Sequence, residues 1–258
     1  MQARNQIAVL FYFLFLNIIC MSAQPPAFCD PATGLCTPAP LAESTATIEW
    51  REDVEIIYVG DPMCSWCWGI SPQLNQLKRK GEEVGIPYRI VVGGLRPGGG
   101  DEWNDKFKDF LKHHWEEVNE RSGQPFGYEL FEQNEFNYDT EPSCRAVVVA
   151  RQLAPEQEER FFELVQHHFY VKNKDPKKTE FYRPICLELG IDFEAFSESF
   201  ESIEAQQLTQ VDFQLNRQWG VRGFPTVILR VGTQMYGLAT GFATFDQMWE
   251  GVEQLVEN

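Results

Sequence analysis

Two cysteines, Cys64 and Cys67, lie three residues apart in the segment DPMCSWCWG, which spans residues 61–69. Thiols at this spacing can form a reversible disulfide, supply two ligands of a metal site, or pack as inert buried groups. Ser65 and Trp66 lie between the sulfurs and would tune the reduction potential of a redox pair. Neither is a histidine or a lysine, so a thiolate here must be stabilised mainly by the backbone around it.

The elements that must position the two cysteines favour redox chemistry. Residues 54–60, VEIIYVG, are apolar and rich in β-branched side chains, which predicts a strand buried on both faces. Cys64 then opens a predicted helix, with Leu74 and Leu77 facing the core. Unpaired N–H groups and the helix dipole stabilise negative charge at a helix N-terminus, so we expect the helix to stabilise the Cys64 thiolate. A stabilised thiolate would make the disulfide a stronger oxidant.

A block of helices is predicted between two groups of strands. Residues 87–94 predict a second strand, and the glycine-rich residues 93–100 predict a linker, because they lack the Lys and Ser/Thr of a phosphate loop. From residue 101 to 219, apolar side chains recur at three- and four-residue steps, which predicts helices. One of these helices would present Leu208, Val211 and Leu215.

The ends of the helical block carry further signals. Thr140, just before Glu141 and Pro142, predicts a helix N-cap followed by a proline in the first turn. Residues 226–232 and 234–242 predict an antiparallel hairpin, and the apolar spacing that begins at Phe245 predicts a final amphipathic helix.

The first residues predict export. Residues 1–23 combine a basic start, an apolar run from Ile7 to Cys20 and small residues, which is the layout of a secretory signal peptide. A retained membrane anchor is the alternative, although the run is shorter than the ~20 residues that a spanning helix needs. We therefore expect a periplasmic or secreted protein, with contact to a membrane only through an uncleaved signal.

Residues 24–53 predict an extended leader that contains Cys29 and Cys36. The intervening DPATGL is typical of a turn, which would bring these two cysteines together. Disulfides persist outside the cytosol, so we expect a second disulfide here, either structural or exchanging electrons with Cys64 and Cys67. Cys144 and Cys186 could pair with each other or stay free.

The charge of the chain limits its partners. The formal net charge is −16 at pH 7. A sequence-independent nucleic-acid binder needs clustered Lys and Arg, so nucleic acid is not an expected partner. Anionic membrane surfaces are not expected as partners for the same reason.

Four segments together resemble one known family. The chain resembles the DsbA family of thiol-disulfide oxidoreductases, within it the branch of FrnE-like proteins and predicted protein-disulfide isomerases. The resemblance covers residues 54 to the C-terminus. It rests on DPMCSWCWG at 61–69, GGLRPG at 93–98, EPSCRAVVVAR at 141–151 and GVRGFPT at 220–226.

The resemblance implies an α/β, thioredoxin-like fold with a large α-helical insertion. Residues 54–100 and 220–258 would form the thioredoxin-like domain, and residues 101–219 the insertion. The family holds a cis proline opposite its cysteine pair, which implies a cis bond between Phe224 and Pro225. Trp66, Phe224 and Pro225 would contact substrate.

We therefore expect an exported thiol-disulfide oxidoreductase whose catalytic residues are Cys64 and Cys67. It needs no cofactor or metal. Its partners would be cysteine-containing unfolded or exported proteins and a recycling protein of unknown identity. The family label of isomerase does not by itself predict isomerase activity. A disulfide isomerase generally needs a dimerisation module, and residues 24–53 are too short to supply one.

Two other functions stay open. Cys64 and Cys67 could bind a soft metal, copper or zinc, together with Cys29 and Cys36 or with a histidine of the pairs at 113–114 and 167–168. A glutathione-dependent isomerase of small molecules has a similar fold, although such enzymes typically lack the complete cysteine pair.

Overall fold

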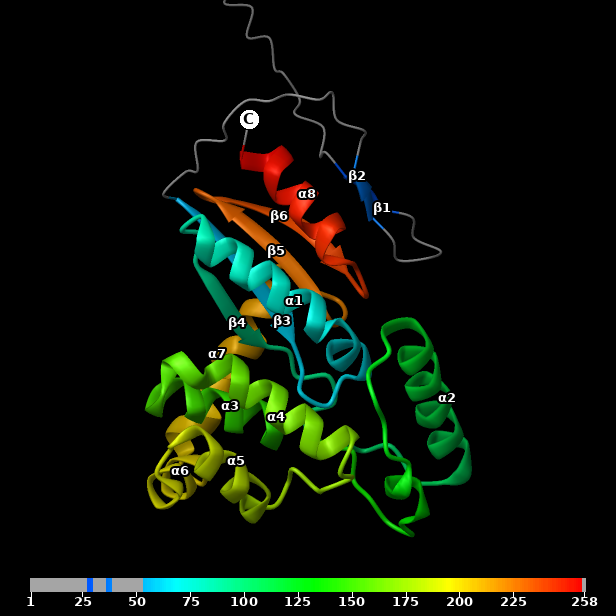
Figure 1. Cartoon of the computed structure of the whole chain (residues 1–258). Helices are drawn as coiled ribbons and strands as arrows, with labels where there is room; N and C mark the ends of the chain where they lie inside the picture. The colour runs from blue at the N-terminus through cyan, green and yellow to red at the C-terminus, as the bar shows by residue number, and fades with distance from the viewer. Residues whose placement is uncertain (1–26, 30–35, 39–52, 257–258) are drawn as a thin grey trace, which may run out of the picture.

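A four-stranded mixed sheet forms the centre of the protein (Figure 1). In this computed structural model, residues 27–29, 36–38 and 53–256 are described. The strand order is β4-β3-β5-β6, with β3 parallel to β4 and the other neighbours antiparallel. The strands are β3 (Val54–Gly60), β4 (Tyr88–Val92), β5 (Thr226–Val231) and β6 (Gln234–Thr240). The predicted strands and the predicted hairpin are confirmed.

Alternation along β3 divides the core between the two faces of the sheet. Ile56 and Tyr58 belong to the larger apolar cluster, on the face covered by α1 (Ser65–Glu83) and α8 (Phe245–Val256). Ile57 and Val59 belong to a separate cluster with Leu215, Trp219 and Val221. The predicted helix after the cysteine motif and the final helix are confirmed, and Leu74 and Leu77 of α1 are buried as expected.

Six α-helices lie between β4 and β5, joined in part by short 3₁₀ turns, and these form the predicted insertion. In Figure 1, α3 to α6 gather below the sheet, whereas α2 stands to one side of it. The fold is therefore the thioredoxin-like α/β fold with a large helical insertion. The helices are α2 (Asp105–Ser122), α3 (Glu141–Leu153), α4 (Glu158–Tyr170), α5 (Arg183–Leu189), α6 (Phe193–Phe200) and α7 (Ile203–Gln218).

An aromatic cluster connects the insertion to the cysteine motif. Met63 and Trp68, on either side of the two cysteines, pack into this cluster. The Tyr138 hydroxyl donates a hydrogen bond to the Met63 carbonyl oxygen at 2.9 Å. The motif is thereby held by the insertion as well as by the sheet. The other buried members of the cluster are Leu111, Trp115, Leu130, Phe136, Phe169 and Tyr170.

The insertion meets the free edge of β4 through polar side chains. Asp212 of α7 accepts a hydrogen bond from the Val92 N–H at 3.0 Å, and Asn216 donates to the Val92 carbonyl oxygen at 2.7 Å. Arg151 of α3 donates to the Ile90 carbonyl oxygen at 3.1 Å and to Asp212 at 2.9 Å. These side chains satisfy backbone groups that a further strand would otherwise pair.

This contact corrects one part of the pattern predicted for α7. Leu208 and Leu215 pack against the core, whereas Val211 is 48% exposed. The helix also buries Asp212 and Asn216, because the edge of β4 requires hydrogen-bonding partners. The pattern of apolar residues carries no information about that requirement.

The cap predicted at Thr140 is also corrected. Thr140 precedes α3, but its side chain makes no capping hydrogen bond. Asp139, one residue earlier, accepts the Glu141 N–H at 3.0 Å instead. The Thr140 hydroxyl oxygen accepts the Arg96 N–H at 3.0 Å, and Asp139 also accepts the Gly98 N–H at 2.7 Å. The predicted linker at 93–100 is therefore bound to the start of α3.

Part of the predicted leader forms a two-stranded antiparallel ladder beside α8 (Figure 1). Its strands are β1 (Ala27–Cys29) and β2 (Cys36–Pro38), and Cys29 lies opposite Cys36 in the register. The predicted signal peptide at 1–23 lies outside the described residues, as does most of the leader. Of the helices in the described part of the chain, none has the length and apolarity to cross a membrane. The predicted domain boundaries stay a prediction.

Replacing Asp212 tests the polar attachment of the insertion. We expect Asp212→Ala to lower the free energy of unfolding by about 3 kcal/mol, because it leaves the buried Val92 N–H without a partner and Arg151 without one of its two carboxylates. Urea denaturation measures this loss. Asp109→Ala, on the exposed surface of α2, is the control and should change stability by less than about 0.5 kcal/mol. Equal stabilities of the two variants would contradict the assignment.

Candidate active site

Cys64 and Cys67 occupy the N-terminus of α1 in two different environments. Cys64 is the N-cap residue, and its side chain is 5% exposed. Its thiol donates a hydrogen bond to the Phe224 carbonyl oxygen at 3.5 Å. Cys67 lies one turn further along and is fully buried. Both are buried free thiols in this structure, and Cys67 is the more deeply buried of the two.

The Phe224–Pro225 peptide bond is cis, as expected, and it faces the cysteine pair through the Phe224 carbonyl group. The Phe224 ring is half-buried and lies against Gly93. A Cβ atom at Gly93 would lie 2.7 Å from that ring, so no other residue fits there without moving Phe224. Sequence analysis placed Gly93 at the end of the predicted strand and in the GGLRPG motif but gave it no role at the site, although paired glycines after a strand are a signal of close approach.

The tryptophans on either side of Cys67 differ in exposure. Trp66 is half-buried, and its ring makes an edge contact with Phe242 at 6.5 Å between ring centroids. Trp68 is 7% exposed, and its indole N–H donates to the Pro125 carbonyl oxygen at 3.0 Å. Trp68 is therefore a core residue, whereas Trp66 borders the site. Ser65, the first residue of α1, is also half-buried.

Asp61 connects the segments of the site, and sequence analysis did not single it out. Its fully buried carboxylate accepts the Met63 N–H at 2.8 Å and the Leu95 N–H at 2.6 Å. Its backbone N–H donates to the Cys67 sulfur at 3.5 Å, and its carbonyl oxygen accepts the Cys64 N–H at 3.0 Å. The signal was present, because Asp-Pro directly after a buried strand is typical of a turn held by the aspartate side chain.

Burial governs the ionisation of this region. It raises the pKa of the Cys67 thiol well above its ordinary value, and the neighbouring Cys64 adds to the effect. Burial also raises the pKa of Asp61, although the N–H groups of Leu95 and Met63 oppose the change. A thiolate at Cys67 is thus disfavoured, and its proton must be moved whenever the buried sulfur reacts.

The remaining cysteines are separate from the redox pair. Cys144 and Cys186 are both buried free thiols, so the pairing that the sequence left open is not formed. The Cys144 thiol donates to the Asp61 carboxylate at 3.4 Å, and burial raises its pKa well above the ordinary value. Burial raises the pKa of Cys186 to about 12. Raised pKa values make both thiols poor nucleophiles.

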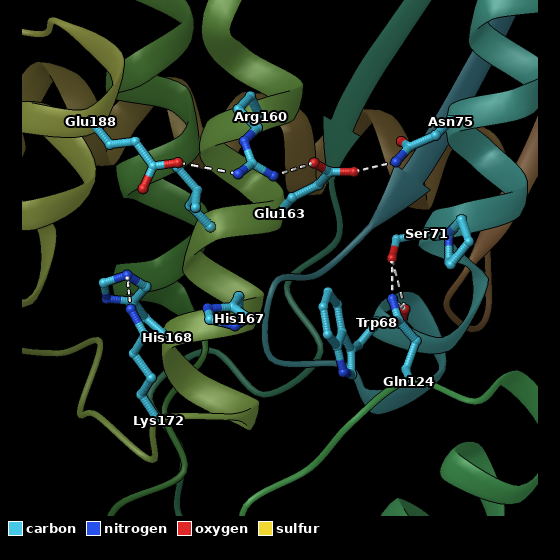
Figure 2. Close-up of a pocket in the computed structure, with 12 residues that line it drawn as sticks. Trp68, Ser71, Asn75, Gln124, Arg160, Glu163, His167, His168, Lys172 and Glu188 are labelled. Carbon is cyan, nitrogen blue, oxygen red and sulfur yellow. Dashed lines mark hydrogen bonds and ion pairs between the residues drawn. The ribbon is translucent and has the colours of Figure 1, made fainter.

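A cleft of about 380 Å³ lies between α1 and α4, beside Trp68 (Figure 2). Arg160 crosses it, with ion pairs of 3.1 Å to both Glu163 and Glu188. The Lys172 ammonium group donates a hydrogen bond to His168 Nε2 at 3.1 Å. The cleft is thus lined by paired charges, and His168 belongs to its wall.

The histidines do not gather at the cysteine pair. His113 is 68% exposed and lies 3.3 Å from Glu117 on α2, and His168 is buried in the cleft. No cluster of three or more His, Cys, Asp or Glu side chains suited to a metal ion occurs in the part of the chain that the structure describes. The side chains of Cys29 and Cys36 lie outside the described residues.

Comparison with known proteins finds one matching family model and several similar solved structures. The family model of the DSBA-like thioredoxin domain matches residues 55–251. The crystal structure of a "putative protein disulfide isomerase" from Nitrosomonas europaea is 32% identical, with a TM-score of 0.73, over 80% of this chain and 98% of that chain. The cytosolic disulfide reductase DsbM from Pseudomonas aeruginosa is 25% identical, with a TM-score of 0.63, over 78% of this chain and 98% of that chain.

Curated relatives are more distant. The ClpXP adapter protein SpxH from Shouchella clausii is 24% identical over 204 residues, which are 78% of this chain and 65% of that protein. SpxH from Bacillus subtilis is 24% identical over 69% of this chain and 58% of that protein. The chain thus spans less than two thirds of the length of these two relatives.

The pH dependence of stability tests the environment of His168. Burial, then the charge of Lys172, lowers its pKa from 6.5 to about 4. The folded state therefore favours the neutral imidazole, and its contribution to stability is present above pH 6.5 and lost as the pH falls toward 4. We expect urea denaturation at pH 7 and pH 4.5 to show a larger loss for the wild type than for His168→Gln. His113→Gln, at an exposed site, should follow the wild type. Parallel behaviour of wild type and His168→Gln would refute the assignment.

Proposed function

The chain belongs to the DSBA-like thioredoxin domain family, and on that premise we propose that it exchanges disulfides with protein substrates through Cys64 and Cys67. The observation that carries the proposal is the position of the Cys64 sulfur. It lies at the N-terminus of a helix and 3.5 Å from the carbonyl oxygen that precedes the cis proline. The unpaired N–H groups of the first helical turn can stabilise a thiolate there.

The two environments give the cysteines different roles. In the oxidising direction, a substrate thiolate attacks the Cys64 sulfur of the Cys64–Cys67 disulfide. This forms a mixed disulfide with Cys64 and releases Cys67 as a thiolate, which takes up a proton. A second substrate thiolate then attacks the substrate sulfur of the mixed disulfide, which yields the substrate disulfide and the Cys64 thiolate. In the reducing direction, Cys64 attacks first and Cys67 resolves the mixed disulfide.

Polypeptides with cysteines fit the site as substrates. Trp66 and Phe224 are both half-buried and border the cysteine pair. The Cys64 thiol lies 3.5 Å from the Phe224 carbonyl oxygen, so an extended chain whose sulfur reacts with Cys64 could contact these aromatic side chains. Ser65 and Trp66, which lie between the two sulfurs, would tune the potential. A separate protein would restore the redox state of the pair.

We propose that the protein acts outside the cytosol, in the periplasm or as a secreted protein. The basic start, apolar run and small residues at 1–23 support this, as do Cys29 and Cys36, which lie opposite each other in the β1–β2 ladder. Its relative DsbM is described as cytosolic. Localisation is therefore a point on which this chain would differ from that relative.

The reductase direction is the second candidate. DsbM is described as a disulfide reductase, and one of its structures contains glutathione, at 25% identity and a TM-score of 0.61. Glutathione is accordingly a suitable small thiol for this chain in either direction. The equilibrium of the Cys64–Cys67 pair with glutathione would decide between oxidase and reductase. For copper or zinc binding, the described residues supply no group of three or more suitable side chains, and the side chains of Cys29 and Cys36 lie outside them.

Single replacements of the two cysteines test the proposed roles. Cys64→Ser should abolish reaction with oxidised glutathione at the site, because Cys67 is buried and disfavoured as a thiolate. Cys67→Ser should accumulate a mixed disulfide between Cys64 and glutathione, because nothing resolves it. Intact-mass spectrometry measures both species. Cys186→Ser, a buried cysteine outside the site, should behave as the wild type. Stoichiometric copper or zinc binding by a wild type that exchanges no disulfide would contradict the proposal.

Expression of the full chain in a Gram-negative bacterium tests the proposed export. We expect the mature protein in the periplasm or medium, with its N-terminus after Ser22 or Ala23 and with a Cys29–Cys36 disulfide. Peptide mass mapping under non-reducing conditions measures both. A cytosolic protein that retains residues 1–23 would contradict export. If Cys29→Ser with Cys36→Ser left re-oxidation of Cys64 and Cys67 unchanged, the pair would be structural.

A further inference from the structure

Pro72 interrupts the hydrogen bonding of α1, the helix that carries the two cysteines. In an α-helix each carbonyl oxygen accepts the N–H four residues later, but a proline has no N–H to donate. The residue four before Pro72 is Trp68, so the Trp68 carbonyl oxygen has no partner within the helix backbone. Trp68 directly follows Cys67 and ends the first turn of α1. The interruption therefore lies one turn from the N-terminus that holds Cys64.

A side chain of the helical insertion supplies the missing donor. Gln124, in the loop after α2, donates through its amide nitrogen to the Trp68 carbonyl oxygen at 3.1 Å and to the Ser71 hydroxyl oxygen at 2.8 Å. Ser71 in turn donates to the Trp68 carbonyl oxygen at 2.9 Å. An amide nitrogen carries two N–H groups, so Gln124 can make both bonds at once. Figure 2 shows Gln124 beside Ser71 and Trp68, at the edge of the cleft.

The backbone of Gln124 is itself fixed by the end of α2. The Asn119 side chain donates to the Gln124 carbonyl oxygen at 2.8 Å, and the Gln124 N–H donates to the Ser122 hydroxyl oxygen at 3.2 Å. Gly123 ends α2 with a φ of 74°, in the left-handed region that favours glycine. The amide of Gln124 thus extends from a backbone that is already held in place.

Helices α1 and α2 are in close contact beside this bond. A Cβ atom at Gly69 would lie 2.7 Å from the Val118 side chain, so the two helices leave no room for a larger residue there. The Trp68 indole N–H donates to the Pro125 carbonyl oxygen at 3.0 Å. The loop after α2 therefore both donates to and accepts from Trp68, and it attaches the first turn of α1 to the insertion.

We propose that Gln124 is a positioning residue for Cys64, because it replaces the N–H that Pro72 cannot donate. The inference rests on the proposed function. The first turn of α1 supplies the N–H groups that can stabilise a Cys64 thiolate, and the Trp68 N–H bonds to the Cys64 carbonyl oxygen at 3.1 Å. Gln124 holds this turn at its far end, so the N–H groups keep their direction when Cys64 becomes charged. It acts through the helix and not by contact with the substrate.

Alkylation of Cys64 tests this role without a protein substrate. Reduced protein is treated with iodoacetamide across pH 4 to 9, and tandem mass spectrometry gives the rate at Cys64. We expect Gln124→Met to shift the pH profile toward higher pH, with alkylation about tenfold slower where the rate rises, because only the thiolate reacts and a lost hydrogen bond loosens the turn that stabilises it. The equilibrium with glutathione should move by the same factor, which lowers the reduction potential by about 30 mV.

Replacing the proline separates the missing N–H from general damage to the helix. Alanine at position 72 restores a helical donor for the Trp68 carbonyl oxygen, so Gln124→Met combined with Pro72→Ala should recover the wild-type profile. This double variant also serves as the test if Gln124→Met alone does not fold. Gln76→Met is the matched control. Gln76 is exposed and donates to the Pro72 carbonyl oxygen at 3.2 Å, but residue 76 keeps its backbone N–H, so the profile should not change.

The outcomes distinguish the positioning role from the proposed function. An unshifted profile in Gln124→Met, or a shifted profile in the double variant, would overturn the role of Gln124 while disulfide exchange stands. A wild type that exchanges no disulfide, but whose Cys64 shows the shift and its rescue, would overturn the proposed function and support the effect of Gln124 on Cys64.

Discussion

The buried carboxylate of Asp61 is the interaction on which the geometry of the site depends. It follows β3 directly and accepts N–H groups from Met63 in the cysteine motif and from Leu95 in the loop after β4. The Cys144 thiol of α3 donates to the same carboxylate. Three segments distant in sequence thus meet at one side chain that water does not reach. Because an ionised carboxylate is costly to bury, these donors are a condition for its place in the fold.

Held in this way, the motif places Cys64 at the helix N-terminus and Cys67 one turn deeper in the core. Met63 and Trp68 pack into the aromatic cluster of the insertion, whereas Cys67 belongs to the main core beneath the sheet. Cys64 is left at the helix N-terminus, facing Phe224. The arrangement favours attack at one sulfur and protects the other. It also creates the need to move a proton to a position that solvent does not reach.

The helical insertion contributes to the site as well as to the fold. Its helices α3 and α7 supply polar partners to the open edge of β4, so the sheet and the insertion form one structure. Helix α4 forms one wall of the cleft.

The sequence by itself determined the order of the elements, the cysteine pair at a helix N-terminus and the resemblance that implied the cis bond at Pro225. These follow from local spacing and from motifs, which are properties of short segments. The role of Asp61, the space that Gly93 leaves for Phe224 and the polar face of α7 were decided only by the tertiary structure. Each depends on a contact between segments far apart in the chain. Such contacts follow from how unpaired backbone groups and side-chain volumes are matched across the fold, and neither periodicity nor composition encodes that matching.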